Sequence, residues 1–395
     1  MIEGLGSLLA IATVAAVVPL IVGLFNIRVA DVVLLLGGGI LFGPELLGFI
    51  TVDAPIELLY ELGLGMLFFM AGLELHPASI TGKGGRLAAT GWFISLALAL
   101  SVGGVLAFGT VSLDTLGFSI ALTSTALGTL LPVLRDSGEL GTRFGRLFMG
   151  AGAWGELGPI VAIAILLGTK SKFAAILTLA VFGLIALALV WVPARLATQR
   201  VRAVFERGHH TSAQTAVRFT MLLLIGLLAI SGSFGLDVVL GAFAAGLIVR
   251  RLAPPSENSL LMTRIEAIAF GFLVPIFFVV SGANLDVRAI VDSPGGLAIA
   301  FLLLLLVRGV PQYFLYRDAI PDRRERARFA LLVATGLPII VAVTSLEVAQ
   351  GLMTPQIAAI LVGAGALSVL VFPLVGNWLV RGQSPLAQER AANTD

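Results

Sequence analysis

The sequence predicts an all-α polytopic membrane protein with about thirteen transmembrane helices. Hydrophobic residues make up 58% of the 395 residues and charged residues only 12%, which is more apolar surface than the core of one soluble domain can bury. Apolar runs of about 20 residues recur along the chain, and a run of that length can cross a bilayer as a helix. We therefore expect residues 1–395 to form a single transmembrane domain with the lipid bilayer as its surroundings.

Charged residues and clusters of Gly and Pro separate the apolar runs and so mark the ends of the expected spans. An odd number of spans places the two termini on opposite sides of the membrane. We expect thirteen spans, at residues 5–24, 29–46, 54–75, 86–108, 114–134, 143–168, 173–195, 216–233, 236–252, 265–283, 296–316, 327–348 and 355–380.

The distribution of basic residues tests this count. Of the 25 Lys and Arg residues, 21 fall in loops and tails that lie inside when the N-terminus is outside. Only Lys170, Lys172 and Arg288 fall in the outer loops, and Arg308 falls within a span. Because cytoplasmic loops carry an excess of Lys and Arg, we expect the N-terminus outside and the C-terminus in the cytoplasm.

The odd count also predicts internal symmetry. Spans one to six start outside and spans eight to thirteen start inside, so two six-helix halves have opposite orientations, as in many secondary transporters. We expect a first inverted repeat at 1–168, a linker helix and inner loop at 169–211, a second inverted repeat at 212–380 and a short cytoplasmic tail at 381–395.

One span in each half is expected to break in the middle of the membrane. Unwound backbone is tolerated at that depth only where protein or a water-filled cavity satisfies it, so two matching breaks indicate a substrate site between them. Alternatively, these residues only pack helices closely or kink them. The breaks contain Thr123, Ser124 and Thr125 in span five and Thr335, Gly336 and Pro338 in span twelve.

Two charged residues lie in otherwise apolar spans. Glu156 is near the middle of span six and Arg308 is in the middle of span eleven. An intramembrane charge is costly and normally marks an ion or proton pathway. We expect Glu156 to exchange a proton for a metal cation, with oxygen ligands from the broken helices, and Arg308 to compensate its charge. The alternative is a buried structural ion pair between the two residues.

Other carboxylates are expected at the margins of the membrane. Glu74 ends span three on the cytoplasmic side, Glu266 lies near the inner face, and Asp237 and Glu347 lie near the outer face. Each of these side chains can extend to water or cap a helix as easily as guide ions.

The remaining composition excludes several classes of site. The absence of cysteine rules out disulfides, thiolate metal sites and cysteine catalysis. Three histidines do not favour a zinc centre, and no phosphate-binding glycine motif is present. We expect no enzymatic activity, no cofactor, no bound structural metal and no nucleic-acid partner.

Four stretches resemble the monovalent cation/proton antiporter superfamily, specifically the branch that contains glutathione-gated potassium efflux proteins and bacterial Na⁺/H⁺ exchangers. Span three reads LGLGMLFFMAGLEL, similar to the family's LGLxxLLFxxGLEL. Span nine contains GAFAAGLIVR, and span five contains ALTSTALGTLLPVL. Span ten reads FLVPIFFVVSGANLD, like the family's FxPIFFxxxGxxLD.

This resemblance implies a fold and a mechanism. It implies a mobile core of spans four to six and eleven to thirteen, a dimerising panel of spans one to three and eight to ten, and elevator-like movement of the core. Glu156 corresponds to the essential Asp of the family, Arg308 to its basic residue in span eleven, and 123–125 to its unwound crossing segment. One departure stands out, because the family usually presents Asn-Asp, Asp-Asp or Gln-Asp where this chain has Gly155-Glu156.

We therefore expect a homodimeric transporter of the bacterial inner membrane that exchanges Na⁺ or K⁺ for H⁺. If Glu156 is the one titrating group of the site, exchange is electroneutral. The alternatives are a transporter of another solute on the same scaffold, such as an organic anion held by Arg308, and a channel or non-transporting sensor. No span carries the continuous polar face that a water-filled pore requires.

Overall fold

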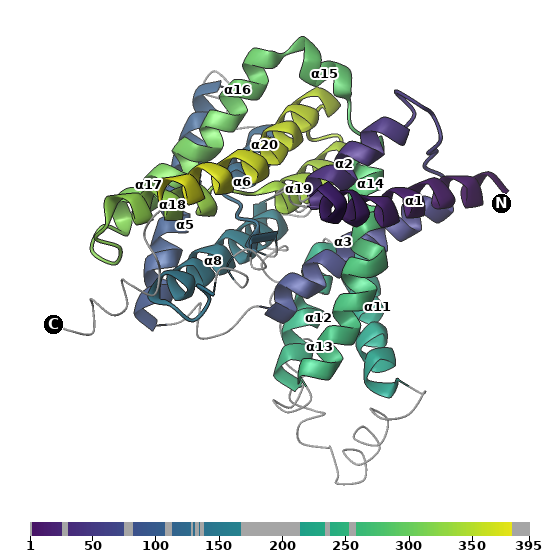
Figure 1. The fold of residues 1–395 in the computed structure, drawn as a ribbon, viewed down its shortest axis with the longest axis horizontal. Helices are drawn as coiled ribbons and strands as arrows, with labels where there is room; N and C mark the ends of the chain where they lie inside the picture. The colour runs from purple at the N-terminus through teal and green to yellow at the C-terminus, as the bar shows by residue number, and fades with distance from the viewer. Residues whose placement is uncertain are drawn as a thin grey trace, which may run out of the picture. The chain divides into compact units, whose positions relative to one another are not determined.

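The computed structural model describes residues 2–25, 31–74, 82–106, 113–127, 129–130, 134, 138–166, 214–233, 238–252 and 258–380 (Figure 1). These residues are helical apart from short turns and unwound segments, and they contain no β-strand. Eight of the described helices are long and apolar enough to cross a membrane. The predicted all-α polytopic architecture is confirmed.

The chain divides into two compact units. The first combines residues 1–27, 34–75 and 160–284, and the second combines 28–33, 76–159 and 285–395. The helices of the first unit are α1 (Ile2–Phe25), α2 (Asp31–Phe42, from Leu34 onward), α3 (Ala54–Glu74), α11 (Thr215–Ser233), α12 (Val238–Leu252), α13 (Asn258–Ile268), η1 (Ala269–Leu273) and α14 (Val274–Ala283).

The second unit contains the helices that carry the predicted broken segments and both intramembrane charges. These helices are α5 (Gly82–Leu106), α6 (Leu113–Leu122), α8 (Arg143–Leu166, up to Pro159), α15 (Val287–Asp292), α16 (Pro294–Leu303), η2 (Leu304–Gly309), α17 (Val310–Leu315), α18 (Arg323–Val333), α19 (Leu337–Ala349) and α20 (Pro355–Leu379).

Twelve of the thirteen expected spans coincide with helical segments of the described chain. The expected span at 173–195 lies outside the described residues, as do the linker at 169–211 and the tail at 381–395. The two units group the spans as the family resemblance implied, with spans one to three and eight to ten in one unit and most of the others in the second. The boundaries of the inverted repeats remain predictions.

Close helix packing in the first unit depends on glycine. A Cβ atom on Gly72 of α3 would overlap the backbone of Phe243 in α12, and one on Gly246 of α12 would overlap the backbone of Phe69 in α3. Small residues let two backbones approach, and dispersion contacts then replace the hydrophobic effect that is missing in lipid. The two glycines thus allow α3 and α12 to pack closely against each other.

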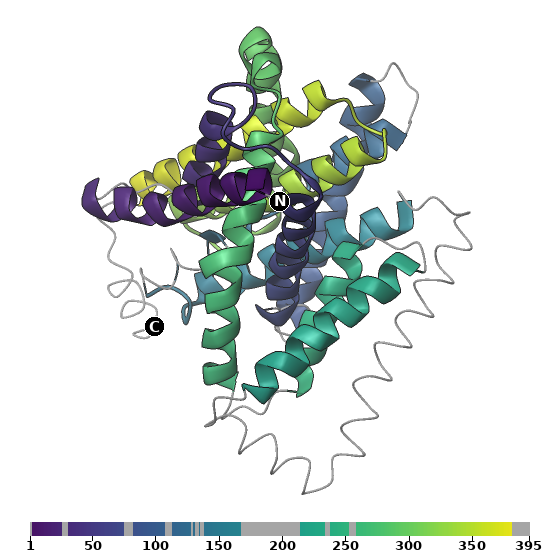
Figure 2. The ribbon, with the colours of Figure 1, turned by 90° about the vertical axis from the view of Figure 1, so that its right-hand side faces the viewer.

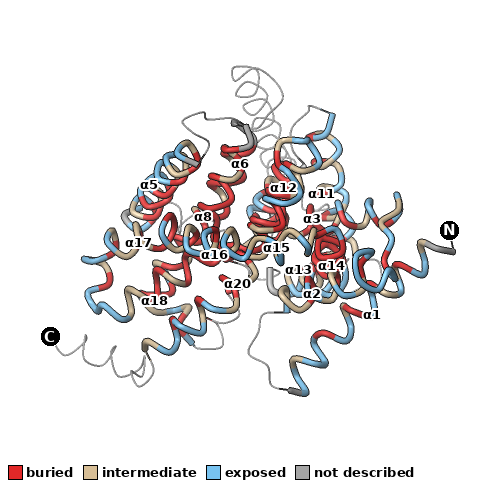
Figure 3. Tube along the Cα trace, turned by 90° about the horizontal axis from the view of Figure 1, so that it is seen from above, coloured by how far each residue is buried: buried red, intermediate tan, exposed pale blue. Residues whose placement is uncertain are grey.

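The helix α1 exposes large apolar side chains along its length. Leu9, Leu20 and Leu24 are 70%, 69% and 80% exposed, and Figure 3 shows much of this helix in the pale blue of exposed residues. A soluble protein rarely presents such a continuous apolar surface to water. Lipid chains are the surroundings that this helix fits.

Two long helices widen into a π-helical turn just before a proline. The backbone N–H of Val274 donates to the carbonyl of Ala269, and that of Val310 donates to Leu305, so both are i to i−5 bonds. Pro275 and Pro311 follow at once. Because proline has no N–H and its ring clashes with the carbonyl four residues earlier, the helix accommodates it by this wider turn. Figure 2 shows the first of these helices running on through its turn, in green.

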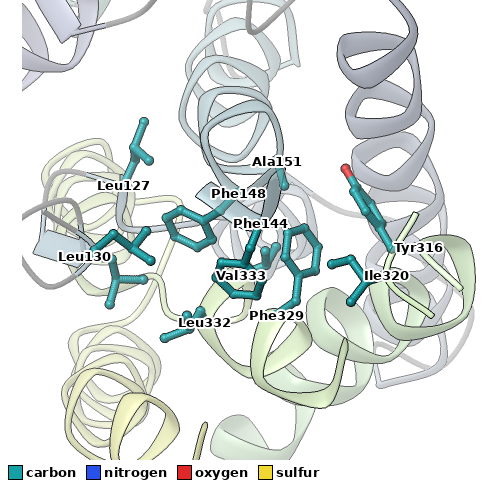
Figure 4. Close-up of a cluster of buried hydrophobic side chains, with 11 residues drawn as sticks. Leu127, Leu130, Phe144, Phe148, Ala151, Tyr316, Ile320, Phe329, Leu332 and Val333 are labelled. Carbon is teal, nitrogen blue, oxygen red and sulfur yellow. The ribbon is translucent and has the colours of Figure 1, made fainter. Parts of the chain in front are cut away.

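A cluster of aromatic and aliphatic side chains forms the core of the second unit between α8 and α18 (Figure 4). The ring of Phe329 lies 5.8 Å from that of Phe144, at 87°, and 4.5 Å from that of Tyr316. Edge-to-face and tilted pairs of this kind are favoured by the quadrupoles of the rings. The cluster fixes α18 and the end of α17 against α8.

A buried ion pair lies beside this core. The Nη1 atom of Arg328 on α18 lies 2.8 Å from Oε1 of Glu139, and the two side chains are only 8% and 9% exposed. The Nε–H of Arg328 donates to Oδ1 of Asn377 on α20, and its guanidinium lies over the ring of Phe144. The pair therefore connects α18 and α20 to the loop that precedes α8.

We expect Arg328→Met to destabilise the protein by about 3–5 kcal/mol, because it leaves the Glu139 carboxylate buried without its cation. Thermal unfolding in detergent measures this as a lowered midpoint, and Arg328→Met combined with Glu139→Gln should recover part of the loss. Arg317→Met is the matched control, because the pair of Arg317 with Asp318 is exposed and contributes little. A wild-type midpoint for Arg328→Met alone contradicts the expectation.

Candidate functional site

Two unwound segments cross in the second unit, at the breaks that the sequence predicted. The helix α6 ends at Leu122, residues 123–126 are not helical, and helical structure resumes at Leu127. In the other half, α18 ends at Val333 and α19 starts at Leu337. Each predicted span is therefore a pair of half-helices.

Hydrogen bonds join the two unwound segments directly. The backbone N–H of Ala126 donates to the carbonyl of Thr335 at 2.5 Å, and the Thr125 hydroxyl donates to the carbonyl of Val333 at 2.7 Å. Gly336 lies against Ser124 so closely that a Cβ atom would overlap its hydroxyl oxygen. The crossing satisfies backbone groups that a break at membrane depth would otherwise leave unpaired.

The hydroxyl groups next to the first break also satisfy the end of α6. The Thr123 hydroxyl donates to the carbonyl of Ile120 at 2.8 Å, and the Ser124 hydroxyl donates to Ala121 at the same distance. The last carbonyls of a helix have no intrahelical partner, so local side chains commonly bind them. In this conformation Thr123 and Ser124 shape the break. Ser124 and Thr125 also reach the opposite half, where the Ser124 hydroxyl donates to the carbonyl of Gly336 at 3.2 Å.

Pro338 explains where the second break ends. It occupies the first turn of α19, where its missing N–H is harmless and its fixed φ suits a helix start. Thr335 and Pro338 are buried, and the Thr335 hydroxyl donates back to Leu331. The three residues predicted for span twelve therefore form the break and the start of the next half-helix.

Glu156 lies on α8 beside the crossing. Its side chain is 6% exposed, and its Oε1 atom accepts a hydrogen bond from the backbone N–H of Leu127 at 3.1 Å. Leu127 is the first residue of the resumed helix, and the N-terminus of a helix carries positive partial charge. The positive end of this helix dipole at the crossing therefore contacts the carboxylate of Glu156.

Arg308 lies on the π-helical turn η2 and is fully buried. Its Nε–H donates to the Thr125 hydroxyl at 3.1 Å, and its Nη2 donates to the carbonyl of Ala151 at 2.9 Å. Among the described residues no ion pair joins it to Glu156. The buried ion pair that the sequence left open is therefore not formed in this conformation, since the guanidinium binds neutral oxygens of the crossing and of α8 instead.

The packing around position 155 explains why a glycine occupies it. A Cβ atom at this position would overlap the side chain of Thr125 and would lie 2.8 Å from Nη2 of Arg308. The carbonyl of Gly155 accepts from the N–H of Thr125 at 3.0 Å. The place where the family usually carries a polar side chain is thus occupied by the guanidinium and the crossing segment.

The sequence left three roles open for Glu347, which were contact with water, helix capping and ion guidance. In the structure Glu347 is 1% exposed on α19. A Cβ atom on Gly117 of α6 would overlap its carboxylate. Hydropathy gives the depth of a residue along a helix but not the direction of its side chain, so the burial could not be predicted.

Sequence reasoning also missed buried polar residues near the crossing. Gln312 is fully buried one turn beyond Arg308, and Trp92 on α5 is 4% exposed. An amide in an otherwise apolar span was a usable signal for Gln312. Trp92 gave no such signal, because tryptophan is common in apolar segments.

Comparison with known proteins identifies the family of the chain. Residues 10–382 match the family described as the transmembrane domain of sodium/hydrogen exchangers. The chain belongs to this family. The resemblance drawn from its motifs is confirmed, and membership in the exchanger family places the chain among membrane transporters rather than enzymes.

Relatives of this exchanger-family chain are named as Na⁺/H⁺ antiporters and as a potassium-efflux protein. It is 23% identical over 387 residues to the putative Na⁺/H⁺ antiporter YjbQ of Bacillus subtilis, which covers 93% of this chain and 62% of that protein. It is 23% identical to the probable Na⁺/H⁺ antiporter 3 of Methanocaldococcus jannaschii, with 92% and 94% covered. It is 26% identical to the glutathione-regulated potassium-efflux protein KefC of Escherichia coli, with 93% and 59% covered. The chain thus spans about three fifths of the Bacillus and Escherichia proteins.

The fold is also found in a solved antiporter structure. The sodium proton antiporter MjNhaP1 of Methanocaldococcus jannaschii matches with a TM-score of 0.64 at 17% identity, over 96% of this chain and 99% of that chain. The expected sodium/proton antiporter fold is therefore confirmed.

Proposed function

We propose that this chain exchanges Na⁺ or K⁺ for H⁺ and that Glu156 binds the two ions in turn. The observation that carries the proposal is the buried Glu156 carboxylate at the crossing of two unwound segments. An ionisable group at membrane depth normally marks the path of an ion or a proton.

The chemistry of the crossing suits a hard monovalent cation. Unwound backbone and hydroxyl groups offer neutral oxygen atoms, and half-helix ends add partial charge. One carboxylate balances one monovalent cation, and protonation of the same carboxylate removes the charge that holds that cation. Among the described residues, no group of three or more His, Cys, Asp or Glu side chains is placed to hold a metal ion.

The names of the relatives support this function but differ in the ion. Two are named as Na⁺/H⁺ antiporters and one as a potassium-efflux protein. We propose a bacterial inner-membrane location with the N-terminus outside and the C-terminus in the cytoplasm. We further propose a homodimer in which the second unit is the moving core of an elevator-like cycle.

Transport assays in proteoliposomes with an enclosed pH dye test this proposal. Addition of Na⁺, K⁺ or Li⁺ to acid-loaded vesicles should raise the internal pH, with one of the three cations giving the highest rate. Organic anions are tested as the alternative substrate, because Nη1 of the buried Arg308 has no hydrogen-bond partner in the described part of the chain. If an organic anion drives proton movement and none of the cations does, the proposed cation/proton antiport is wrong and the chain transports an anion.

We expect the exchange to be electroneutral, because one titrating carboxylate carries one cation or one proton. The balance point of the cation and proton gradients should then stay the same when the membrane potential is clamped between zero and about −100 mV. Net movement of one charge would change the driving force by about 2.3 kcal/mol at that potential. A shift of that size would show that a second proton site takes part.

A further inference from the structure

Three helical segments of the second unit meet beside the cation site, and their contact encloses polar side chains. Gln312 of α17 packs against α5, where a Cβ atom on Gly91 would lie 2.5 Å from its Oε1 and 2.6 Å from its Nε2. Trp92 of α5 packs against α8, where a Cβ atom on Gly158 would overlap the indole. We call the contact formed by Trp92, Trp154, Arg308 and Gln312 the three-helix junction.

The α8 helix brings the members of the junction together. The rings of Trp92 and Trp154 lie 6.4 Å apart, and Arg308 lies against Gly155, the residue next to Trp154. Gln312 follows Arg308 by one helical turn. Glycines on α5 and α8 therefore make the room that the four large side chains fill.

Every member of the junction has a buried polar atom without a hydrogen-bond partner among the described residues. These atoms are Nε1 of Trp92, Nε1 of Trp154, Nη1 of Arg308, and both Oε1 and Nε2 of Gln312. A buried unsatisfied polar group typically costs about 1–3 kcal/mol. Native proteins rarely carry several at one place, and ordered water is the usual partner where protein groups are lacking.

The donor and acceptor pattern excludes a cation at this place. Indole N–H groups and a guanidinium only donate, and among these five atoms the Gln312 oxygen is the one strong acceptor. The guanidinium also repels a cation. Water can accept from the donors and donate to the amide oxygen, so its hydrogen-bonding chemistry suits all five atoms.

We propose that the three-helix junction is a water-binding site distinct from the cation site and that Gln312 is a positioning residue for Arg308. The Nε and Nη2 atoms of Arg308 are fixed by Thr125 and Ala151. Water held by Gln312 solvates the remaining Nη1 and stabilises the guanidinium without a carboxylate. The carboxylate of Glu156 then serves the transported cation.

The second part of this proposal rests on the proposed function, and cation kinetics test it. In the Gln312→Leu variant the water site loses both amide atoms, so Arg308 turns towards Glu156 and competes with the cation. The apparent KM for the cation should rise about tenfold, which corresponds to about 1.4 kcal/mol, with kcat nearly unchanged. Gln312→Glu should restore the low KM, because the introduced carboxylate pairs with Nη1 itself.

Phe314→Leu is the matched control on the same helix, since Phe314 is 67% exposed. It should leave both constants at the wild-type values. A lowered kcat with unchanged KM in Gln312→Leu would overturn the positioning role, and so would constants equal to those of the wild type.

The water site itself is tested without any transport measurement. An electron cryo-microscopy map of the wild-type protein that resolves ordered water should show density at hydrogen-bond distance, about 3 Å, from the Gln312 amide and from Nη1 of Arg308. This density should be absent from the map of the Gln312→Leu variant. A dry junction in the wild-type map overturns the water site even if the chain transports cations, and hydrated density supports it even if the cation assays fail.

Discussion

Replacing Glu156 by Gln should reduce cation-driven proton movement to the rate of protein-free liposomes. The amide keeps the shape of the side chain and can still accept from the N–H of Leu127, but it neither titrates nor balances a cation. The measurement is the initial rate of internal pH change after addition of the cation that gives the highest wild-type rate. The protein should remain folded, with a thermal midpoint close to that of the wild type.

Two further variants serve as comparisons for Glu156→Gln. Glu61→Gln changes an exposed carboxylate of α3 in the first unit and should keep the wild-type rate. Glu156→Asp should retain exchange, because the family resemblance places Asp at this position and the carboxylate still titrates. Wild-type exchange in Glu156→Gln would remove Glu156 from the transport site.

Adding one methyl group at Gly155 should also abolish most of the activity. In Gly155→Ala the added Cβ atom must displace the Thr125 side chain or the Arg308 guanidinium. Thr125 also binds Val333 of the opposite half, so its displacement disturbs the crossing as a whole. Overpacking of this kind typically costs about 1–3 kcal/mol, which should appear as a lower thermal midpoint together with a large loss of exchange.

Gly226→Ala provides the comparison. Gly226 lies inside α11, and a Cβ atom there would meet nothing within 4 Å. The substitution should leave exchange unchanged and should stabilise the helix slightly, because alanine loses less backbone entropy than glycine on folding. Equal behaviour of the two alanine variants would show that Gly155 is not needed to accommodate Arg308 and Thr125.

The sequence was sufficient for most of the elements and for the position of the two breaks. Hydropathy and charge located twelve spans that coincide with described helices, because the bilayer requires a fixed length of apolar helix. The breaks at 123–125 and 335–338 were predictable since Thr, Ser, Gly and Pro satisfy or require unwound backbone. Glu156 and Arg308 stood out because charge is rare at that depth.

The contacts between these elements could not be predicted from the sequence. Thr125 and Val333 are 208 residues apart, and no local pattern pairs them. The partners of Arg308 depend on a π-helical turn that redirects the side chain, and a single sequence gives the proline but not the direction. The same limit explains why the burial of Glu347 could not be predicted and why the role of Gly155 became visible only beside its neighbours.

Proton release on cation binding tests the central claim most directly. Purified protein in weakly buffered detergent solution, near the pH at which half of the sites are protonated, should release protons when the transported cation is added, because the two ions compete for Glu156. The same addition to Glu156→Gln should release none. Cation binding by the wild type without proton release, or equal release by Glu156→Gln, would contradict the assignment of both ions to this carboxylate.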